Sequence, residues 1–136
     1  MKVVNAVYPG PEQIQSFFGA AEDGPFVMVN LLKFKDKAEY ADGSDSHLSG
    51  REAYARYAEE VSKLVEGLGG KIRFGGAVTD LMIGEVEELW DMVALAEYPS
   101  LAAFQQMATS PAMHAIEHHR SAGLKGQLNI KTKPRD

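Results

Sequence analysis

The chain has 136 residues, of which 45% are hydrophobic and 24% are charged, and it contains no cysteine. A chain of this length buries about two-thirds of its unfolded surface, so we expect a single domain over residues 1–136. A net charge of −5 argues against a protein that binds nucleic acid or an anionic membrane. The absence of cysteine excludes disulfides, zinc ribbons and thiol nucleophiles. No segment has the pattern of a signal peptide or a membrane span, so we expect a cytoplasmic protein.

Residues 1–25 are expected to form an extension that contains one short helix. An apolar run over residues 3–8 ends in the turn cluster Pro9-Gly10-Pro11. Apolar side chains then recur every three or four residues, at Ile14, Phe17, Phe18 and Ala21. This spacing predicts an amphipathic helix over 11–21 that closes near Gly24-Pro25.

The segment from Phe26 to Phe34 is almost continuously apolar and rich in residues that favour strands. Its alternate positions are apolar on one side (Phe26, Met28, Leu32, Phe34) and also on the other (Val27, Val29, Leu31). A strand that is apolar on both sides is covered on both sides. We therefore predict a central, buried strand over 26–34.

A polar segment over 36–49 follows, with Tyr40 and Leu48 as its large apolar side chains. Loops of this length are often functional or mobile. We interpret it as a lid over a pocket, and the alternatives are a plain surface insertion or an arm that contacts a second subunit. The pattern Ser49-Gly50-Arg51-Glu52 then fits a capping box, which predicts a helix that ends at the glycines 67, 69 and 70.

The second half of the chain predicts two more strands, two helical segments and a final strand. Residues 71–78 and 81–84 are interpreted as one strand, interrupted at Gly75-Gly76 by a bulge or a close backbone approach. A strand over 89–98 follows. Ser100 and Ser110 precede helical segments, the second of which ends at Gly123. Alternation over 124–132 predicts an edge strand, and a charged tail covers 133–136.

The order strand, helix, strand, strand, helix, strand over the core 26–132 is that of a ferredoxin-like α+β fold. Such a fold is a four-stranded antiparallel sheet with helices on one face, here with an extra N-terminal helix. The helices leave the other apolar face of the sheet exposed, which is unfavourable. We therefore expect a homodimer in which two sheets pack face to face.

Several segments resemble the domain of unknown function 1330 (DUF1330) family of the dimeric α/β-barrel superfamily. The resemblance covers about residues 26–132, and the segments are 27–34, 50–57, 69–70, 97–100 and 110–120. It implies the fold and the homodimer but no reaction, because the family has none assigned. Relatives in the wider superfamily include cofactor-free monooxygenases, haem-degrading enzymes, muconolactone isomerase-like proteins and stress-induced binding proteins.

His114-Ala115-Ile116-Glu117-His118 matches the H-x-x-E-H pattern of one class of zinc proteases. Only 18 residues follow His118 and none is indicated as the third ligand, so we predict no metal site. The alternative is a solvated helix end, where His and Arg interact favourably with the helix dipole. If the protein is an enzyme, His118 is the candidate base, because its ordinary pKa is near neutral.

Five further residues are candidate ligand contacts: Asn30, Lys33, Tyr54, Arg73 and Trp90. Asn30 orients a ligand oxygen or hydrogen-bonds a neighbouring loop, and Lys33 pairs with a partner or extends to solvent. Arg73 faces an anionic ligand or pairs with a carboxylate such as Glu97 or Asp91. Tyr54 either contacts the ligand or packs in the core, and Trp90 lines an aromatic pocket or the dimer interface.

No nucleotide, phosphate or flavin fingerprint is present, and we predict no cofactor. Two functions remain open. The first is a cofactor-independent enzyme, like a monooxygenase or isomerase, that acts on a hydrophobic or aromatic compound. The second is a non-catalytic ligand-binding or stress-response dimer. A small hydrophobic ligand is the expected partner in both.

Overall fold

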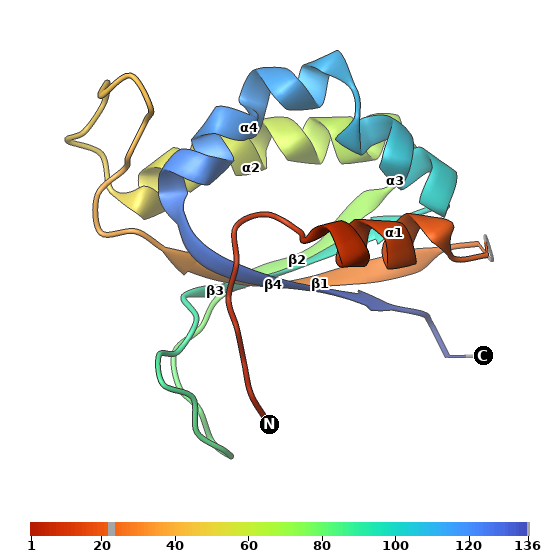
Figure 1. Ribbon diagram of the computed structural model, residues 1–136, viewed down its shortest axis with the longest axis horizontal. Coiled ribbons are helices and arrows are strands. Elements are labelled where there is room, and N and C mark those ends of the chain that lie inside the picture. Colours follow the sequence, from red (N-terminus) through yellow and green to blue (C-terminus); the bar gives the residue numbers. More distant parts are fainter. Residues whose placement is uncertain (22–23, 136) are drawn as a thin grey trace.

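The computed structural model describes residues 1–21 and 24–135. Within these residues, four strands form one antiparallel sheet in the order β2-β3-β1-β4 (Figure 1). The strands are β1 (Phe26–Phe34), β2 (Lys71–Ala77), β3 (Met92–Tyr98) and β4 (Leu124–Thr132). The helices are α1 (Pro11–Gly19), α2 (Gly50–Gly67), α3 (Leu101–Ala108) and α4 (Pro111–Gly123). The α+β fold, the central position of β1 and the edge position of β4 are as predicted.

Helices α2, α3 and α4 lie on one side of the sheet (Figure 1). The predicted capping box starts α2, because the Ser49 hydroxyl accepts from the Glu52 N–H at 3.0 Å and the Glu52 carboxylate accepts from the Ser49 N–H at 2.9 Å. The Ser100 hydroxyl accepts from the Ala103 N–H at the start of α3 and the Ser110 hydroxyl from the Met113 N–H at the start of α4, without the reciprocal bond of a capping box. The main core lies between these helices and β1, around Phe26, Val65 and Tyr98.

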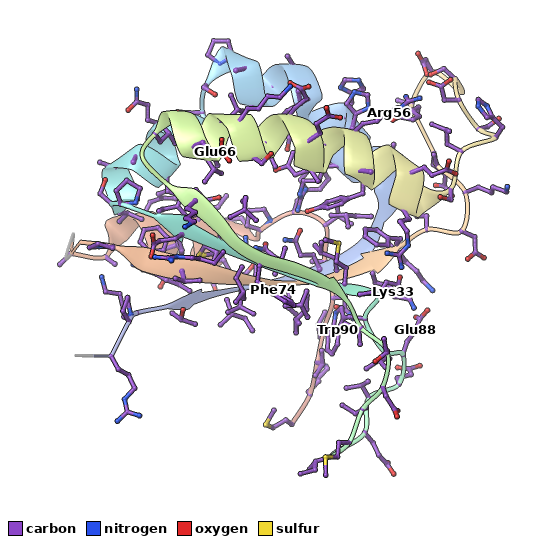
Figure 2. The ribbon with its side chains drawn as sticks, turned by 180° about the vertical axis from the view of Figure 1, so that it is seen from behind. Lys33, Arg56, Glu66, Phe74, Glu88 and Trp90 are labelled. Atoms are coloured by element: carbon purple, nitrogen blue, oxygen red, sulfur yellow. The ribbon has the colours of Figure 1, made fainter. Side chains whose placement is uncertain are left out.

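Strand β1 presents apolar side chains on both of its faces, as predicted. Phe26, Met28 and Leu32 face the helices and are at most 4% exposed. The opposite, helix-free face carries the half-buried side chains of β1, including Val29 and Leu31. The register Val29–Leu95–Phe74 places Phe74 of β2 on the helix-free face, where it is 55% exposed (Figure 2).

The region between β2 and β3 differs from the prediction. Residues 81–84 lie in an exposed loop rather than a strand, and Met82 is 96% exposed. β3 starts at Met92 instead of 89, where its pairing with Leu32 of β1 begins. The Asp91 N–H still donates to the Leu32 carbonyl at 2.7 Å and the Asp91 carbonyl accepts from the Val78 N–H at 2.9 Å, but Leu89 and Trp90 form no ladder pair with β1 or β2. The bulge falls between Ile72 and Phe74 rather than at the glycine pair.

The loop over 36–49 is anchored to two helices. The Ala38 N–H donates to the Leu48 carbonyl and the Glu39 N–H to the Ala122 carbonyl, both at 2.9 Å. Ala38 is buried against Ala53 and Ala122. Tyr40 and Leu48, the large apolar side chains of the loop, pack against these three alanines, so the structure does not support a mobile lid.

The N-terminal extension packs on the edge of the sheet next to β4. Helix α1 ends at Gly19, two residues earlier than predicted, and residues 22–23 before its expected closure lie outside the described residues, as does Asp136 of the predicted tail. The Ala6 N–H donates to the Gln127 carbonyl of β4 at 3.3 Å. Among the described helices, none is long and apolar enough to cross a membrane.

Candidate functional site

A cavity of about 430 Å³ lies between the N-terminal extension and the body of the fold. It is lined by residues of the extension together with side chains of β1, α3, α4 and β4. A volume of this size is within the range of small-molecule sites, which are mostly apolar with a few placed polar groups. The cavity is the candidate binding site of this protein.

Aromatic rings form one wall of the cavity. Phe17 and Phe18 come from α1, where the helical spacing predicted from the sequence turns both toward the core. Their ring centroids lie 5.2 Å and 5.9 Å from that of Phe104 on α3. Met28 of β1 and Ile14 of α1 add aliphatic surface. The wall therefore suits the apolar body of a ligand.

The polar end of the cavity is a chain of three hydrogen-bonded side chains. The Arg120 Nη2 donates to the Gln127 Oε1 at 2.7 Å and to the Val7 carbonyl at 2.6 Å. The Gln127 Nε2 donates to the Asn30 Oδ1 at 2.7 Å, and the Asn30 Nδ2 donates to the Ala94 carbonyl at 3.2 Å. Arg120 and Gln127 line the cavity directly. Asn30 does not line the cavity but fixes the Gln127 side chain through this hydrogen bond.

A glycine in β4, Gly126, allows the N-terminal extension to approach this strand closely. Gly126 is buried, and a Cβ at this position would lie 2.7 Å from the Asn5 Cβ. Only glycine permits this approach without a shift of the neighbouring segment. The Asn5 Oδ1 in turn accepts from the Trp90 Nε1 at 2.8 Å, which ties the start of the extension to the loop before β3.

A second depression, of about 590 Å³, is lined mainly by charged residues, and we call it the charged groove. Its lining residues are Lys33, Phe34, Lys35, Asp36, Lys37, Glu39, Glu88, Asp91 and Lys125. Lys33 lies 3.2 Å from Asp91 and 3.6 Å from Glu88, and Lys125 lies 3.0 Å from Glu88. Figure 2 labels Lys33 and Glu88 at the base of the loop between β2 and β3. The Lys125 ammonium, then that of Lys33, holds the pKa of Glu88 below its ordinary value.

The six candidate residues from the sequence do not lie in one site. Asn30 hydrogen-bonds the cavity-lining Gln127 without lining the cavity itself, and Lys33 lines the charged groove. Arg73 forms an exposed ion pair with Glu97 at 2.9 Å, one of the two carboxylate partners that the sequence offered. Trp90 donates to Asn5 and does not line the cavity.

Tyr54 and His118 occupy different surroundings from the cavity. Tyr54 packs against Phe34 and Tyr57 in the core, and burial raises the pKa of its phenol. His118 is exposed on α4, and its ring centroid lies 3.9 Å from that of His119. His119 Nδ1 and the Tyr40 hydroxyl are 2.7 Å apart. Burial, followed by the charge of His118, lowers the pKa of His119.

No group of three or more metal-ligating side chains forms within residues 1–21 and 24–135. The two histidines of the H-x-x-E-H pattern therefore have no third His, Asp or Glu ligand in that part of the chain. The charged residue that lines the described cavity is Arg120, and a guanidinium does not ligate a metal cation.

Arg120 and Gln127 are the site residues that the sequence did not single out. The sequence pattern alone predicts a solvated helix end around Arg120 and a polar position of an edge strand at Gln127. Each pattern is correct locally, because Arg120 lies in the last turn of α4 and β4 is at the sheet edge. No sequence pattern indicates that residues 4–9 pack back against β4. This packing makes the edge strand one wall of the cavity.

A family model for a domain of unknown function, DUF1330, matches residues 43–132. The chain belongs to the DUF1330 family. None of the curated proteins matches this DUF1330 chain. The match begins after β1, so the N-terminal wall of the cavity lies outside the matched range.

Two structures of one bacterial protein are similar to this DUF1330 chain over nearly all of its length. The RPA0582 protein of unknown function from Rhodopseudomonas palustris is 34% identical, covers 98% of this chain and 99% of its own, and has a TM-score of 0.85. The methylated RPA0582 protein is also 34% identical, with 98% of both chains covered and a TM-score of 0.89. The coverage includes the extension, so the likeness extends to the region of the cavity.

More distant structures share the fold alone. A dabb family protein with a ferredoxin-like fold from Mesorhizobium loti is 11% identical, covers 84% of this chain and all of its own, and has a TM-score of 0.51. A dimeric protein of unknown function with a ferredoxin-like fold from Bacteroides fragilis is 14% identical, with 83% and 99% covered and a TM-score of 0.51. The ferredoxin-like fold of this DUF1330 chain is thereby established.

Proposed function

We propose that this DUF1330 protein is a homodimer that binds a hydrophobic small molecule in the cavity of each protomer. The observation that carries the proposal is the cavity itself, which has an aromatic wall and a polar end held in a fixed arrangement. Burial of an apolar ligand against Phe17, Phe18 and Phe104 supplies affinity, and the side chains at the polar end supply orientation.

The arrangement supports a binding protein over an enzyme. His118, the candidate base, does not line the cavity, and its ring packs against His119 and Tyr40. General-base catalysis needs the base within hydrogen-bond reach of the reacting proton. The charged residue of the cavity is an arginine, a residue type that does not serve as a general base at neutral pH. We therefore favour the non-catalytic ligand-binding function of the two that the sequence left open.

The homodimer is supported by the helix-free face of the sheet. Phe74 is 55% exposed and Ile130 is 46% exposed on this face, and the half-buried Val29, Leu31 and Leu95 lie between them. An apolar sheet face of this kind is stabilised by a second apolar surface. The Bacteroides fragilis protein, which shares the fold, is described as dimeric. A second copy of this chain is the partner we propose.

Filling the cavity tests the binding function. Ile14 lines the cavity and is 45% exposed, so Ile14→Trp adds bulk without a demand on the core. Small molecules are extracted from the purified protein and identified by mass spectrometry. We expect a hydrophobic compound to copurify with the native chain and to be lost from Ile14→Trp. The control Ile83→Trp adds the same bulk in an exposed loop and retains the compound. Equal recovery from both variants would contradict binding in the cavity.

A charge on the helix-free face tests the homodimer. Phe74→Asp replaces a side chain that is already exposed in the single chain, so the fold persists while the interface gains an unpaired carboxylate. The alternation of side chains along β1 does not decide which face of the sheet Met28 belongs to. In the structure it is 4% exposed beneath the helices, so a charge at Met28 would not test the interface. We expect light scattering to give twice the chain mass for the native protein and the mass of one chain for Phe74→Asp. A native particle of one chain at micromolar concentration would contradict the homodimer.

A further inference from the structure

We propose that the ligand of the cavity is a hydrophobic monocarboxylate and that Arg120 binds its carboxylate group. This inference rests on the proposed binding function and adds the chemical class of the ligand. Its basis is the unusual position of Arg120, a half-buried cation at the end of an apolar cavity with neutral partners.

The hydrogen-bond partners of Arg120 carry no negative charge. Its Nη2 donates to the Val7 main-chain carbonyl and to the Gln127 side-chain amide oxygen, and its guanidinium lies 5.7 Å from the Tyr8 ring centroid. Across residues 1–21 and 24–135, no carboxylate oxygen lies within 4.0 Å of the Arg120 guanidinium. A partly desolvated charge is costly unless it is paired.

Other half-buried cations of the fold show the usual arrangement. Lys33 lies 3.2 Å from Asp91, and Lys35 lies 3.3 Å from Glu39. Lys131 has no carboxylate within 4.0 Å in the described part of the chain, but its ammonium lies 4.8 Å from the Phe26 ring centroid and it does not line the cavity. Among the described residues, Arg120 is thus a cation that lines the cavity and has no carboxylate partner within the chain. Its charge can be balanced by an added anion.

The geometry around Arg120 prepares it for such an anion. Its two hydrogen bonds both use Nη2, whereas a guanidinium has five N–H groups, so Nη1 and Nε keep three donors for a further acceptor. Gln127 is itself fixed by Asn30, which makes Asn30 a positioning residue for the site. A guanidinium held in one orientation loses less conformational entropy on binding a planar carboxylate.

The rest of the cavity selects the class of anion. One arginine balances a single negative charge, and a phosphate dianion would bring a second charge beside the rings of Phe17 and Phe104. The aromatic and aliphatic wall requires an apolar body next to the charged group. A carboxylate on an aromatic or aliphatic skeleton meets both conditions.

Acid and amide pairs test this inference, because a primary amide matches a carboxylate in shape but carries no charge. The probes are 2-naphthylacetate and decanoate, each with its amide, titrated into the full-length protein at pH 7.5 by calorimetry. We expect at least one acid to bind about tenfold more tightly than its amide, as a charge-assisted pair with arginine provides. In Arg120→Gln the acid should lose this advantage while the amide keeps its affinity within about twofold.

Three further variants separate the possible outcomes. Arg120→Lys keeps the charge and should retain part of the preference for the acid. This variant tests the role of the charge even if Arg120→Gln folds poorly. Arg56→Gln removes an exposed arginine that pairs with Asp45 outside the cavity. This variant should leave the affinities for the acids and the amides unchanged. Lys131→Gln should also preserve the preference, and its loss in this variant instead would overturn the assignment to Arg120.

The results for the native protein distinguish this inference from the function on which it rests. Equal binding of an acid and its amide would overturn the monocarboxylate class and leave the cavity as a site for neutral hydrophobic molecules. Failure of all four probes to bind would overturn the binding function together with the ligand class.

Discussion

The charged groove and the cavity hold their cations in opposite ways. In the groove, the Lys33 ammonium lies beside the Asp91 carboxylate, and the Asp91 Oδ2 also accepts from the Phe34 N–H at 2.9 Å. In the cavity, Arg120 contacts a main-chain carbonyl and an amide oxygen. Charges that are neutralised within the chain contribute to the fold, whereas a cation with neutral partners is suited to an added anion. On this difference we base the proposal that the groove stabilises the fold and that the cavity binds the ligand.

The largest effect on stability should come from the groove. Asp91→Ala leaves the Phe34 N–H without its partner and removes the nearer carboxylate of Lys33, whose ammonium keeps the Leu89 carbonyl at 3.0 Å and Glu88 at 3.6 Å. We expect a loss of about 1–3 kcal/mol in the free energy of unfolding, measured by urea denaturation. Ligand binding by the folded variant should be unchanged. A variant as stable as the native protein would remove the structural role from the groove.

A smaller effect on stability is expected at the cavity. Arg120→Met removes two hydrogen bonds but also a charge whose burial is unfavourable, so we expect a loss of about 1 kcal/mol or less in the free energy of unfolding. The same variant should lose the preference for carboxylates. A cost larger than that of Asp91→Ala, with ligand binding intact, would reverse the comparison of the two regions.

The smallest effect concerns pH. The pKa of Glu88 is lowered in the folded state from its ordinary value of 4.5, chiefly by Lys125. A lowered carboxyl pKa contributes stability above pH 4.5, and this stability is lost as the pH falls through the folded value. Glu88 is fully exposed, so the contribution is small. Denaturation curves at pH 6 and below should show a weaker acid dependence in Glu88→Gln and an unchanged one in Arg120→Met, because arginine does not titrate there.

The fold was accessible from the sequence because its signals are local. Period-two and period-3.6 patterns and the serines at positions 49, 100 and 110 place the strands and the helix starts. The failures share one cause. Residues 81–84 have the composition of a strand but no neighbouring strand, and residues 36–49 have the composition of a mobile loop but form main-chain hydrogen bonds to a distant helix.

The candidate site was less accessible because it depends on long-range contacts. Asn30 is identifiable from the sequence as a polar side chain in an apolar strand, and it hydrogen-bonds the cavity-lining Gln127. Its partner Gln127 is 97 residues away, and Arg120 contacts Val7 across 113 residues. No periodicity connects positions so far apart. Residue types that pointed to chemistry, such as His118 and Trp90, instead contact neighbours outside the cavity.

The amide signals of Gln127 provide the most direct test of the cavity as the binding site. The Gln127 side-chain NH₂ group donates to Asn30 beside Arg120, so a ligand in the cavity changes its surroundings. In a ¹⁵N-labelled sample titrated with 2-naphthylacetate or decanoate, we predict that the Gln127 side-chain signals and the main-chain signals of residues 127–130 shift together. Signals of Lys33, Glu88 and Asp91 in the charged groove should stay in place. Shifts confined to the charged groove, or no shifts at saturating concentration, would contradict the account.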